Sequence, residues 1–289
     1  MSAHTPDFDT LWDYTKPAET EQRFRQLLET AAQSPDPAYH LQLLTQIARA
    51  QGLQGCYDDA HLTLDSIEDK LHQARLVEIR YLLERGRVFN SSGQPEKAQP
   101  LFQQAWELAS AEHEDFYAID AAHMLAIIAP PEEQRVWNLK ALALAEASRD
   151  VRAQKWRAAL YNNLGWSYHE HGFYDKALTM FEKALEWRLA HGQEREIRIA
   201  RWCVARALRS LQRCEEALTI QHELLAEHQR AGTHDGYIYE EIGECLLLLK
   251  RAAEAPPYFA RAYDYLSQDG WLAAHETPRL ARLKTLATP

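Results

Sequence analysis

Apolar residues recur at helical spacing through most of this chain, and the most regular stretch runs from Ala158 to Trp187. Its first half places apolar or small residues at positions i, i+3, i+4 and i+7, which form one helix face: Tyr161, Leu164, Gly165 and Tyr168. Its second half does the same after a turn at Gly172: Ala177, Phe181 and Ala184. Small residues let two helix backbones approach, and aromatic side chains fill the space beside them. The pattern therefore predicts a tightly packed helical hairpin.

This hairpin resembles the tetratricopeptide repeat (TPR), a helix–turn–helix unit of about 34 residues. The resemblance rests on the small and aromatic residues just named, which occupy almost every signature position of that family. One such hairpin cannot bury its apolar face alone. The resemblance therefore implies neighbouring copies of the unit along the chain.

Sliding this template along the chain gives six copies. The close-packing position of the first helix recurs at intervals of 36 to 43 residues: Ala48, Gly86, Ala122, Gly165, Ala205 and Gly243. The second helix carries alanine in five of the six copies, with a glutamine in the third: Ala60, Ala98, Gln134, Ala177, Ala217 and Ala255. The next signature position is more varied: Leu64, Phe102, Asn138, Phe181, Gln221 and Phe259. These intervals are similar to the long-repeat TPR type of kinesin light chains and bacterial peptide-receptor regulators.

The segments outside the six copies predict capping helices, which cover the apolar faces of a solenoid's end repeats. One helix begins near Pro17, and Trp12 and Tyr14 pack against the first repeat. The other begins with Thr277 as N-cap and Pro278 at the first helical position. The predicted fold is all-α, a right-handed superhelical solenoid of about six TPR-like hairpins with caps. The predicted parts are an N-terminal cap (1–37), six repeats (38–270) and a C-terminal cap (271–289).

Composition narrows the kind of partner. The 289 residues carry a net charge of −10, which disfavours nucleic acids and anionic membranes as partners. No apolar run approaches the length of a membrane span, and no signal peptide is visible. The cysteines form no CxxC pair and no zinc-type spacing, which indicates reduced thiols in a cytoplasmic protein: Cys56, Cys203, Cys214 and Cys245.

In TPR arrays the first helix of each repeat lines a concave groove that binds partner segments. Carried over position by position, the resemblance gives a candidate peptide-binding groove: Arg49, Arg80, Arg87, Asn90, His123, Asn162, Trp166, His169, Trp202, Arg206 and Arg209. These groove positions hold a single acid, Glu170, in the first five repeats, whereas Glu240 and Glu244 reverse the sign in the last. Arginine donates paired hydrogen bonds to carboxylates, and tryptophan anchors binding hot spots. The groove therefore predicts a partner peptide with acidic and apolar side chains.

An alternative interpretation needs no ligand. Arg80, Glu84 and Arg87 are spaced i+4 and i+3, so they can pair on a solvated helix face. Trp166 and Trp202 can equally be covered by neighbouring helices as ordinary core. Some TPR domains clamp a C-terminal carboxylate with a set of Lys and Asn residues. The lysines of that set are missing here, so the sequence does not predict recognition of such a tail.

No catalytic or metal motif is visible. His169, Glu170 and His171 are adjacent, but they form no HExxH motif, and the chain has no glycine-rich phosphate loop. We therefore expect no catalytic residue, cofactor or metal, and interpret the chain as a non-enzymatic interaction scaffold with a protein or peptide partner. One alternative is a peptide-sensing TPR regulator of the bacterial receptor type. Such regulators usually carry an N-terminal output module, whereas about 37 residues precede the first repeat here. Another alternative is a self-associating structural protein that forms homo-oligomers.

Overall fold

The computed structural model describes residues 7–288, apart from the side chain at position 9. The chain divides into two compact units, Met1–Trp156 and Arg157–Pro289, and each is described by itself. Within the described residues all regular structure is helical. None of these helices combines the length and the apolar character that crossing a membrane requires.

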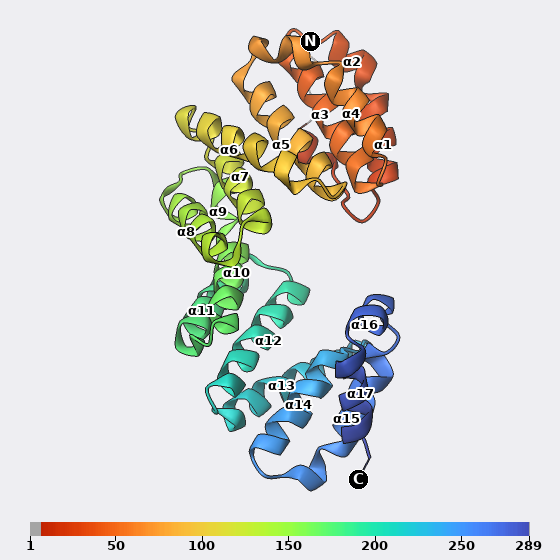
Figure 1. Cartoon of the computed structure of the whole chain (residues 1–289), viewed down its shortest axis with the longest axis vertical. Coiled ribbons are helices and arrows are strands. Elements are labelled where there is room, and N and C mark those ends of the chain that lie inside the picture. Colours follow the sequence, from red (N-terminus) through yellow and green to blue (C-terminus); the bar gives the residue numbers. More distant parts are fainter. Residues whose placement is uncertain (1–6, 289) are drawn as a thin grey trace. The chain divides into compact units, whose positions relative to one another are not determined.

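The first unit holds three helical hairpins, α3–α4, α5–α6 and α7–α8, with short helices before and after them (Figure 1). A core of its own runs through these hairpins. Its elements are η1 (Phe8–Leu11), α1 (Pro17–Gln26), α2 (Leu28–Ala32), α3 (Pro37–Leu53), α4 (Tyr57–Asp65), η2 (Glu68–Gln73), α5 (Arg75–Ser91), α6 (Pro95–Ala111), α7 (Asp115–Ile128), α8 (Pro131–Ala147) and α9 (Val151–Gln154).

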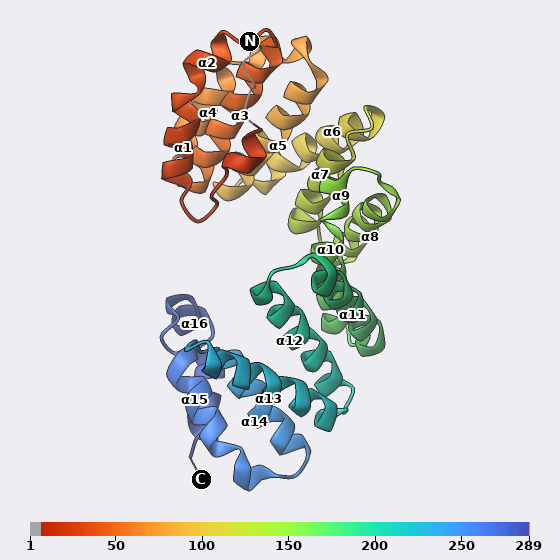
Figure 2. The ribbon, with the colours of Figure 1, turned by 180° about the vertical axis from the view of Figure 1, so that it is seen from behind.

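The second unit holds the hairpins α10–α11, α12–α13 and α14–α15, followed by α16 and α17 (Figure 2). A second core fills its interior. Its elements are α10 (Arg157–Glu170), α11 (Tyr174–His191), α12 (Glu194–Ser210), α13 (Cys214–Arg230), α14 (Gly236–Leu248), η3 (Ala252–Glu254), α15 (Pro256–Leu266), α16 (Gly270–His275) and α17 (Thr277–Leu286).

In three hairpins a glycine of the first helix faces a phenylalanine ring of the second. A Cβ atom added at Gly165 would lie 2.4 Å from the ring of Phe181. The equivalent distances are 2.5 Å for Gly86 and Phe102 and 2.8 Å for Gly243 and Phe259. All three rings are completely buried. The small residues therefore have the close-packing role that the sequence predicts.

The other three hairpins carry alanine at this position and no phenylalanine opposite it. Their second helices place Leu64, Asn138 and Gln221 there, and all three side chains are buried. Asn138 is the eighth residue of α8, as Phe102 is the eighth of α6, so the two second helices have the same register. Alanine is thus accepted where no aromatic ring presses against the first helix.

The helices at the two ends of the chain differ from the predicted caps in two details. Helix α1 begins at Pro17, but the helical segment breaks at Leu27 before α2. The Trp12 indole donates to Gln46 of α3 at 3.0 Å, which attaches the segment before α1 to the first hairpin. The prediction of Thr277 as N-cap is wrong, because the Leu280 amide donates to the Glu276 carbonyl and Thr277 already lies inside the first turn.

Candidate functional site

The predicted groove residues lie on the first helices of the hairpins. Helix α5 contacts both α3 and α7 in the first unit, and α12 contacts α14 in the second. Within each unit the predicted side chains therefore belong to one layer of neighbouring helices. Their contacts differ between the two units.

In the first unit the arginines are held in a chain of ion pairs. Arg49 donates to Glu84 at 3.1 Å, and Arg87 donates to the same carboxylate at 2.6 Å. Arg87 also forms an ion pair with Asp120 of α7. Burial disfavours the charge of Arg87, but Asp120 and Glu84 raise its pKa above the ordinary value. Burial likewise opposes the charge of Asp120, yet the neighbouring arginines lower its pKa. The chain Arg49–Glu84–Arg87–Asp120 is thus a structural link between three first helices.

The remaining predicted residues of the first unit have separate surroundings. Arg80 is 7% exposed and lies over the rings of Phe8 and Tyr117, 5.7 and 5.1 Å from their centroids, with no carboxylate partner among the described residues. His123 lies 5.1 Å from the ring of Trp156, and burial lowers its pKa. Asn90 is half-buried near the end of α5.

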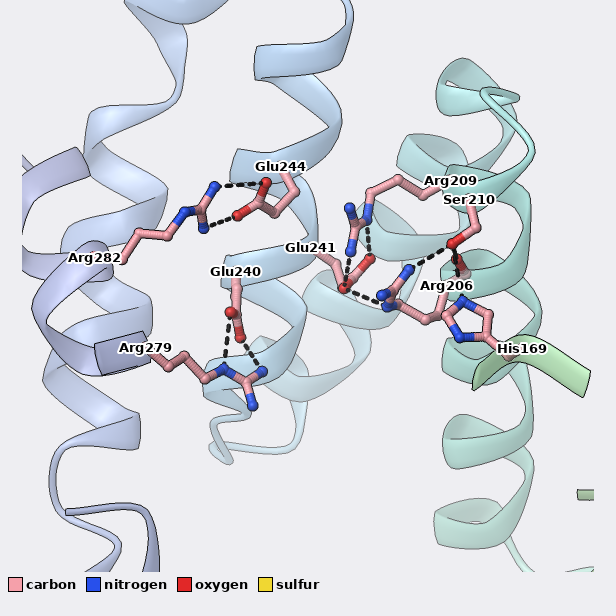
Figure 3. Close-up of polar contacts among 9 residues, drawn as sticks. All are labelled: His169, Arg206, Arg209, Ser210, Glu240, Glu241, Glu244, Arg279 and Arg282. Atoms are coloured by element: carbon pink, nitrogen blue, oxygen red, sulfur yellow. Dashed lines mark hydrogen bonds and ion pairs between the residues drawn. The ribbon is translucent and has the colours of Figure 1, made fainter. Parts of the chain in front are cut away.

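In the second unit Arg206 and Arg209 share one carboxylate (Figure 3). Arg209 donates to Glu241 of α14 at 2.7 and 3.0 Å, and Arg206 lies 3.3 Å from it. Arg206 also donates to the Ser210 hydroxyl at 2.7 Å, and this hydroxyl lies 2.9 Å from Nε2 of His169. Burial and the two arginines lower the pKa of His169 to about 4, so its imidazole is neutral at pH 7. This cluster joins α10, α12 and α14.

The acids of the last repeat are neutralised by the final helix. Arg279 of α17 donates to Glu240 at 3.0 and 2.5 Å, and Arg282 donates to Glu244 at 3.1 Å (Figure 3). The sign reversal visible in the sequence at Glu240 and Glu244 is therefore compensated within the same unit. Between earlier repeats, the later of two neighbouring first helices supplies the acid. Helix α17 follows α14 and supplies the arginines instead.

Sequence spacing predicts Glu84 as a partner of Arg87 but misses Asp120 and Glu241, and all three acids follow one rule. Three of the paired arginines come one residue after the close-packing position of their own repeat: Arg49, Arg87 and Arg206. Arg209 instead comes four residues after Ala205. Each acid comes two residues before the close-packing position of the next repeat: Glu84, Asp120 and Glu241. The groove positions taken from the resemblance exclude this second set. Paired carboxylates therefore stand beside Arg49, Arg87 and Arg206, where the groove positions alone show arginine without acid.

Aromatic rings connect the first helices of the second unit. Trp166 of α10 lies 6.0 Å from Trp202 of α12, which lies 6.1 Å from Tyr237 of α14, measured between ring centroids. We call these three half-buried residues the ring strip. Trp166 also packs edge-on against Phe181 of the core at 5.2 Å. Beside the strip, the Cys203 thiol donates to the Asn162 amide oxygen at 3.5 Å.

A cavity of about 480 Å³ adjoins the ring strip and lies between α12, α13 and α14. We call it the α12–α14 cavity. Trp202 and Tyr237 belong both to the strip and to the cavity wall. The remaining lining residues are Arg195, Arg198, Ile199, Leu224, His228, His234, Asp235 and Ile238.

The histidines and cysteines near the ring strip make contacts within the protein or stay protonated. His169 contacts Ser210, whereas His171 contacts the carbonyl of Ser167 at 2.7 Å, so the adjacent histidines do not converge. No group of three metal-ligating side chains occurs among the described residues. Burial raises the pKa of Cys203 and of Cys245 to about 12, so both thiols stay protonated at neutral pH.

Comparison with known proteins agrees with this architecture. Family models described as tetratricopeptide repeats match residues 80–160 and 157–189. No curated protein sequence matches the chain.

Three solved structures that are similar to the chain share 12% to 16% sequence identity with it. The apo form of RapI has a TM-score of 0.70 at 12% identity, covering 91% of this chain and 76% of that one. A signal transduction ATPase with a tetratricopeptide repeat sensor, from Pyrococcus horikoshii, has a TM-score of 0.67 at 16% identity over 89% and 39% of the two chains. The quorum sensor NprR of B. thuringiensis has a TM-score of 0.53 at 15% identity over 90% and 89%. With family matches over residues 80–160 and 157–189 and a series of helical hairpins, the chain contains tetratricopeptide repeats within an all-α repeat architecture.

Proposed function

We propose that this protein is a non-enzymatic interaction scaffold that binds a peptide segment of a partner protein along the ring strip of the second unit. The observation that carries the proposal is the row of half-buried rings Trp166, Trp202 and Tyr237, which crosses three first helices. Rigid aromatic side chains of this kind supply much of the energy of protein interfaces. Their partial exposure leaves apolar area that a bound peptide would cover.

The arginines next to the strip give the surface a preference for acidic peptides. Arg206 and Arg209 share the single carboxylate of Glu241, so one positive charge of this group is not balanced locally. Both arginine side chains stay partly exposed. Their unused N–H groups can donate to a ligand carboxylate, and charge-assisted bonds of this type are stronger than neutral ones. The first unit lacks this combination, because its ion-pair chain contains two arginines and two acids.

The similar solved structures support the fold on which this proposal depends, and they do not support peptide binding itself. NprR is described as a quorum sensor, and the Pyrococcus horikoshii ATPase is described with a tetratricopeptide repeat sensor. At 15% and 16% identity these descriptions belong to those proteins. Peptide binding by this chain rests on its own ring strip, and the sensor and self-association alternatives stay predictions.

A peptide-display selection against the purified chain tests the proposal. The highest-affinity peptide is synthesised, and its dissociation constant is measured by calorimetry for the wild type and for Trp202→Leu. We expect Trp202→Leu to weaken binding by about tenfold or more, which corresponds to roughly 1.4 kcal/mol. The matched control is Trp271→Leu, because Trp271 is exposed on α16 and stacks on His275 outside the strip. Circular dichroism establishes that both variants remain folded.

Two results would contradict the proposal. Failure of the selection to enrich any peptide would argue against a peptide-binding surface. Equal affinity of wild type and Trp202→Leu would place the binding surface away from the ring strip. A wild-type mass that rises with concentration in size-exclusion chromatography would favour self-association instead.

A further inference from the structure

The α12–α14 cavity has the dimensions and walls of a ligand pocket. Its volume of about 480 Å³ falls within the range of roughly 300–1,000 Å³ that is typical of pockets for small ligands. The side chains of Trp202, Leu224 and Ile238 give it apolar walls. Ile199, 51% exposed, adds an apolar surface that neighbouring helices leave open. The cavity is therefore suited to a bulky apolar group.

The lining also includes two arginines that acids scarcely neutralise. Arg195 is exposed and makes no ion pair with any residue that the structure describes. Arg198 lies 3.7 Å from Glu194, whose side chain is 92% exposed, so this pair contributes little. On the same helix, Arg201 is held by both Glu223 and Glu227 at 2.5 Å. Glu223 and Glu227 thus pair with Arg201, and the cavity lining itself holds one acid, Asp235.

The other polar groups of the cavity are engaged within the protein. Asp235 caps α14 by accepting from the amide of Tyr237 at 2.9 Å. Nδ1 of His228 lies 2.9 Å from the Thr233 hydroxyl, and the ring of His234 stacks on Tyr265 at 4.7 Å. Arg195 and Arg198 therefore remain as the groups available to a charged ligand. They are cationic, and they lie one turn apart on α12.

We propose that the α12–α14 cavity is the specificity pocket for the bound peptide, taking a bulky apolar side chain while the neighbouring Asp or Glu side chain of the peptide pairs with Arg195 and Arg198. This inference rests on the proposed function, because Trp202 and Tyr237 connect the cavity directly to the ring strip. The acid is a side chain within the peptide, since the strip continues from the cavity and an extended chain can follow it.

The test uses the peptide from the display selection, synthesised with an acetylated N-terminus and an amidated C-terminus. Two altered peptides replace its acid by Gln or its bulky apolar residue by Ala. Each is titrated against the wild type and Arg195→Glu/Arg198→Glu. We expect the double variant to weaken the parent peptide about tenfold or more. We expect it to have little further effect on the Gln peptide, because the interaction is then already lost.

Two further variants separate the pocket from general charge and folding effects. Ile199→Trp adds bulk at an exposed position of the lining and should weaken the parent peptide, but not the Ala peptide, relative to wild type. Arg213→Glu/Arg251→Glu makes the same charge change away from the cavity, where both arginines pair locally with acids on the surface. It should leave binding within about twofold of wild type at moderate salt, because screening weakens distant charges.

Each contrary outcome identifies what fails. If Trp202→Leu abolishes binding while the Arg195/Arg198 and Ile199 variants bind normally, the proposed function stands and the pocket assignment is overturned. If the double variant weakens the parent and Gln peptides equally, the arginines act through general charge and the assignment is also overturned. Binding of the free-acid form but not the amidated form would show recognition of a chain end and would contradict the proposal. If Trp202→Leu binds normally, the proposed function fails first.

Discussion

The first helices of both units form ion pairs by one positional rule, and α10 of the second unit departs from it. In the first unit an arginine after each of the close-packing residues Ala48 and Gly86 finds an acid on the next first helix. In the second unit the same position of α10 holds Trp166, whose ring meets Trp202. Replacing one ion pair by a ring converts a neutral structural link into partly exposed apolar surface. The same repeat position can therefore either join neighbouring hairpins through an ion pair or place partly exposed aromatic rings beside each other.

The largest effect is expected from breaking the ion-pair chain of the first unit. Glu84 is buried and accepts from both Arg49 and Arg87. Glu84→Gln leaves two partly buried guanidiniums without their shared charge, and we expect the free energy of unfolding to fall by about 3 kcal/mol. Urea unfolding followed by circular dichroism measures it. In the second unit, Glu241→Gln should have a similar effect, since Glu241 also serves two arginines.

A surface pair provides the control for this measurement. Glu78 pairs with Arg75 on the exposed side of α5 at 2.9 Å. Glu78→Gln should change the unfolding free energy by less than about 1 kcal/mol, because exposed ion pairs contribute little. If Glu84→Gln were as mild as this control, the chain Arg49–Glu84–Arg87–Asp120 would have no structural role.

The next effect tests a feature that both units share. Gly165→Ala places a Cβ atom against Phe181, and Gly86→Ala does the same against Phe102. Overpacking typically costs about 1–3 kcal/mol, and the better helix propensity of alanine returns part of it. We expect each variant to lose about 1–2 kcal/mol of unfolding free energy. Because the two glycines have the same surroundings, the losses should agree between the units.

The first repeat indicates how this loss can be rescued. It combines Ala48 with Leu64, both fully buried, where other repeats combine glycine with phenylalanine. Gly165→Ala/Phe181→Leu should therefore be more stable than the sum of the two single changes predicts. If the two losses of unfolding free energy were strictly additive, contact with the Phe181 ring would not explain why residue 165 is a glycine.

The sequence predicts the hairpins more completely than the site, and the cause is physical. Packing positions repeat with the helix period, so Gly165 and Phe181 are enough to align all six copies, the polar third repeat included. Ion pairs between repeats join residues more than thirty positions apart, as with Arg49 and Glu84. Spacing within one helix indicates a different set of pairs, among Arg80, Glu84 and Arg87. Glu84 and Arg87 do form an ion pair, whereas Arg80 is buried against aromatic rings.

The cavity shows a second limit of predicting a binding site from positions within a single repeat. Its lining combines α12, α13, the segment before α14 and α14 itself. Arg195 and Arg198 lie in the first turns of α12, outside the groove positions carried over from the family resemblance. A mostly unpaired arginine becomes noticeable only when the acids of neighbouring helices have been assigned to other partners. That assignment needs the packing of three helices.

A smaller effect concerns pH and compares one histidine in each unit. The pKa of His169 is about 4 in the folded protein, against an ordinary value of about 6.5 in the unfolded chain. Between these values the unfolded chain binds more protons, so stability rises with pH from 4 to 6.5 and is lost on acidification. Because this ring is partly exposed, we expect a contribution of roughly 1–2 kcal/mol. His169→Gln should flatten the dependence in urea unfolding at a series of pH values.

His123 provides the counterpart in the first unit. Burial lowers its pKa as well, with Asp120 acting in the opposite direction. His123→Gln should therefore flatten the same acidic side of the stability profile. An unchanged slope in both variants would mean that neither imidazole is held neutral by folding.

The smallest effect is expected where the ion pairs reach the end of the second unit. Arg282 is about half exposed and pairs with Glu244, whereas Arg279 is less exposed and also covers the ring of Tyr237 at 5.1 Å. Arg282→Ala should cost about 0.5 kcal/mol of unfolding free energy, as exposed pairs usually do. Arg279→Ala should cost more, because it leaves the buried Glu240 without its partner. Thermal or urea unfolding measures both losses. Equal losses would mean that burial does not determine how much an ion pair contributes to stability. Burial would then not explain the large effect expected at Glu84 in the first unit either.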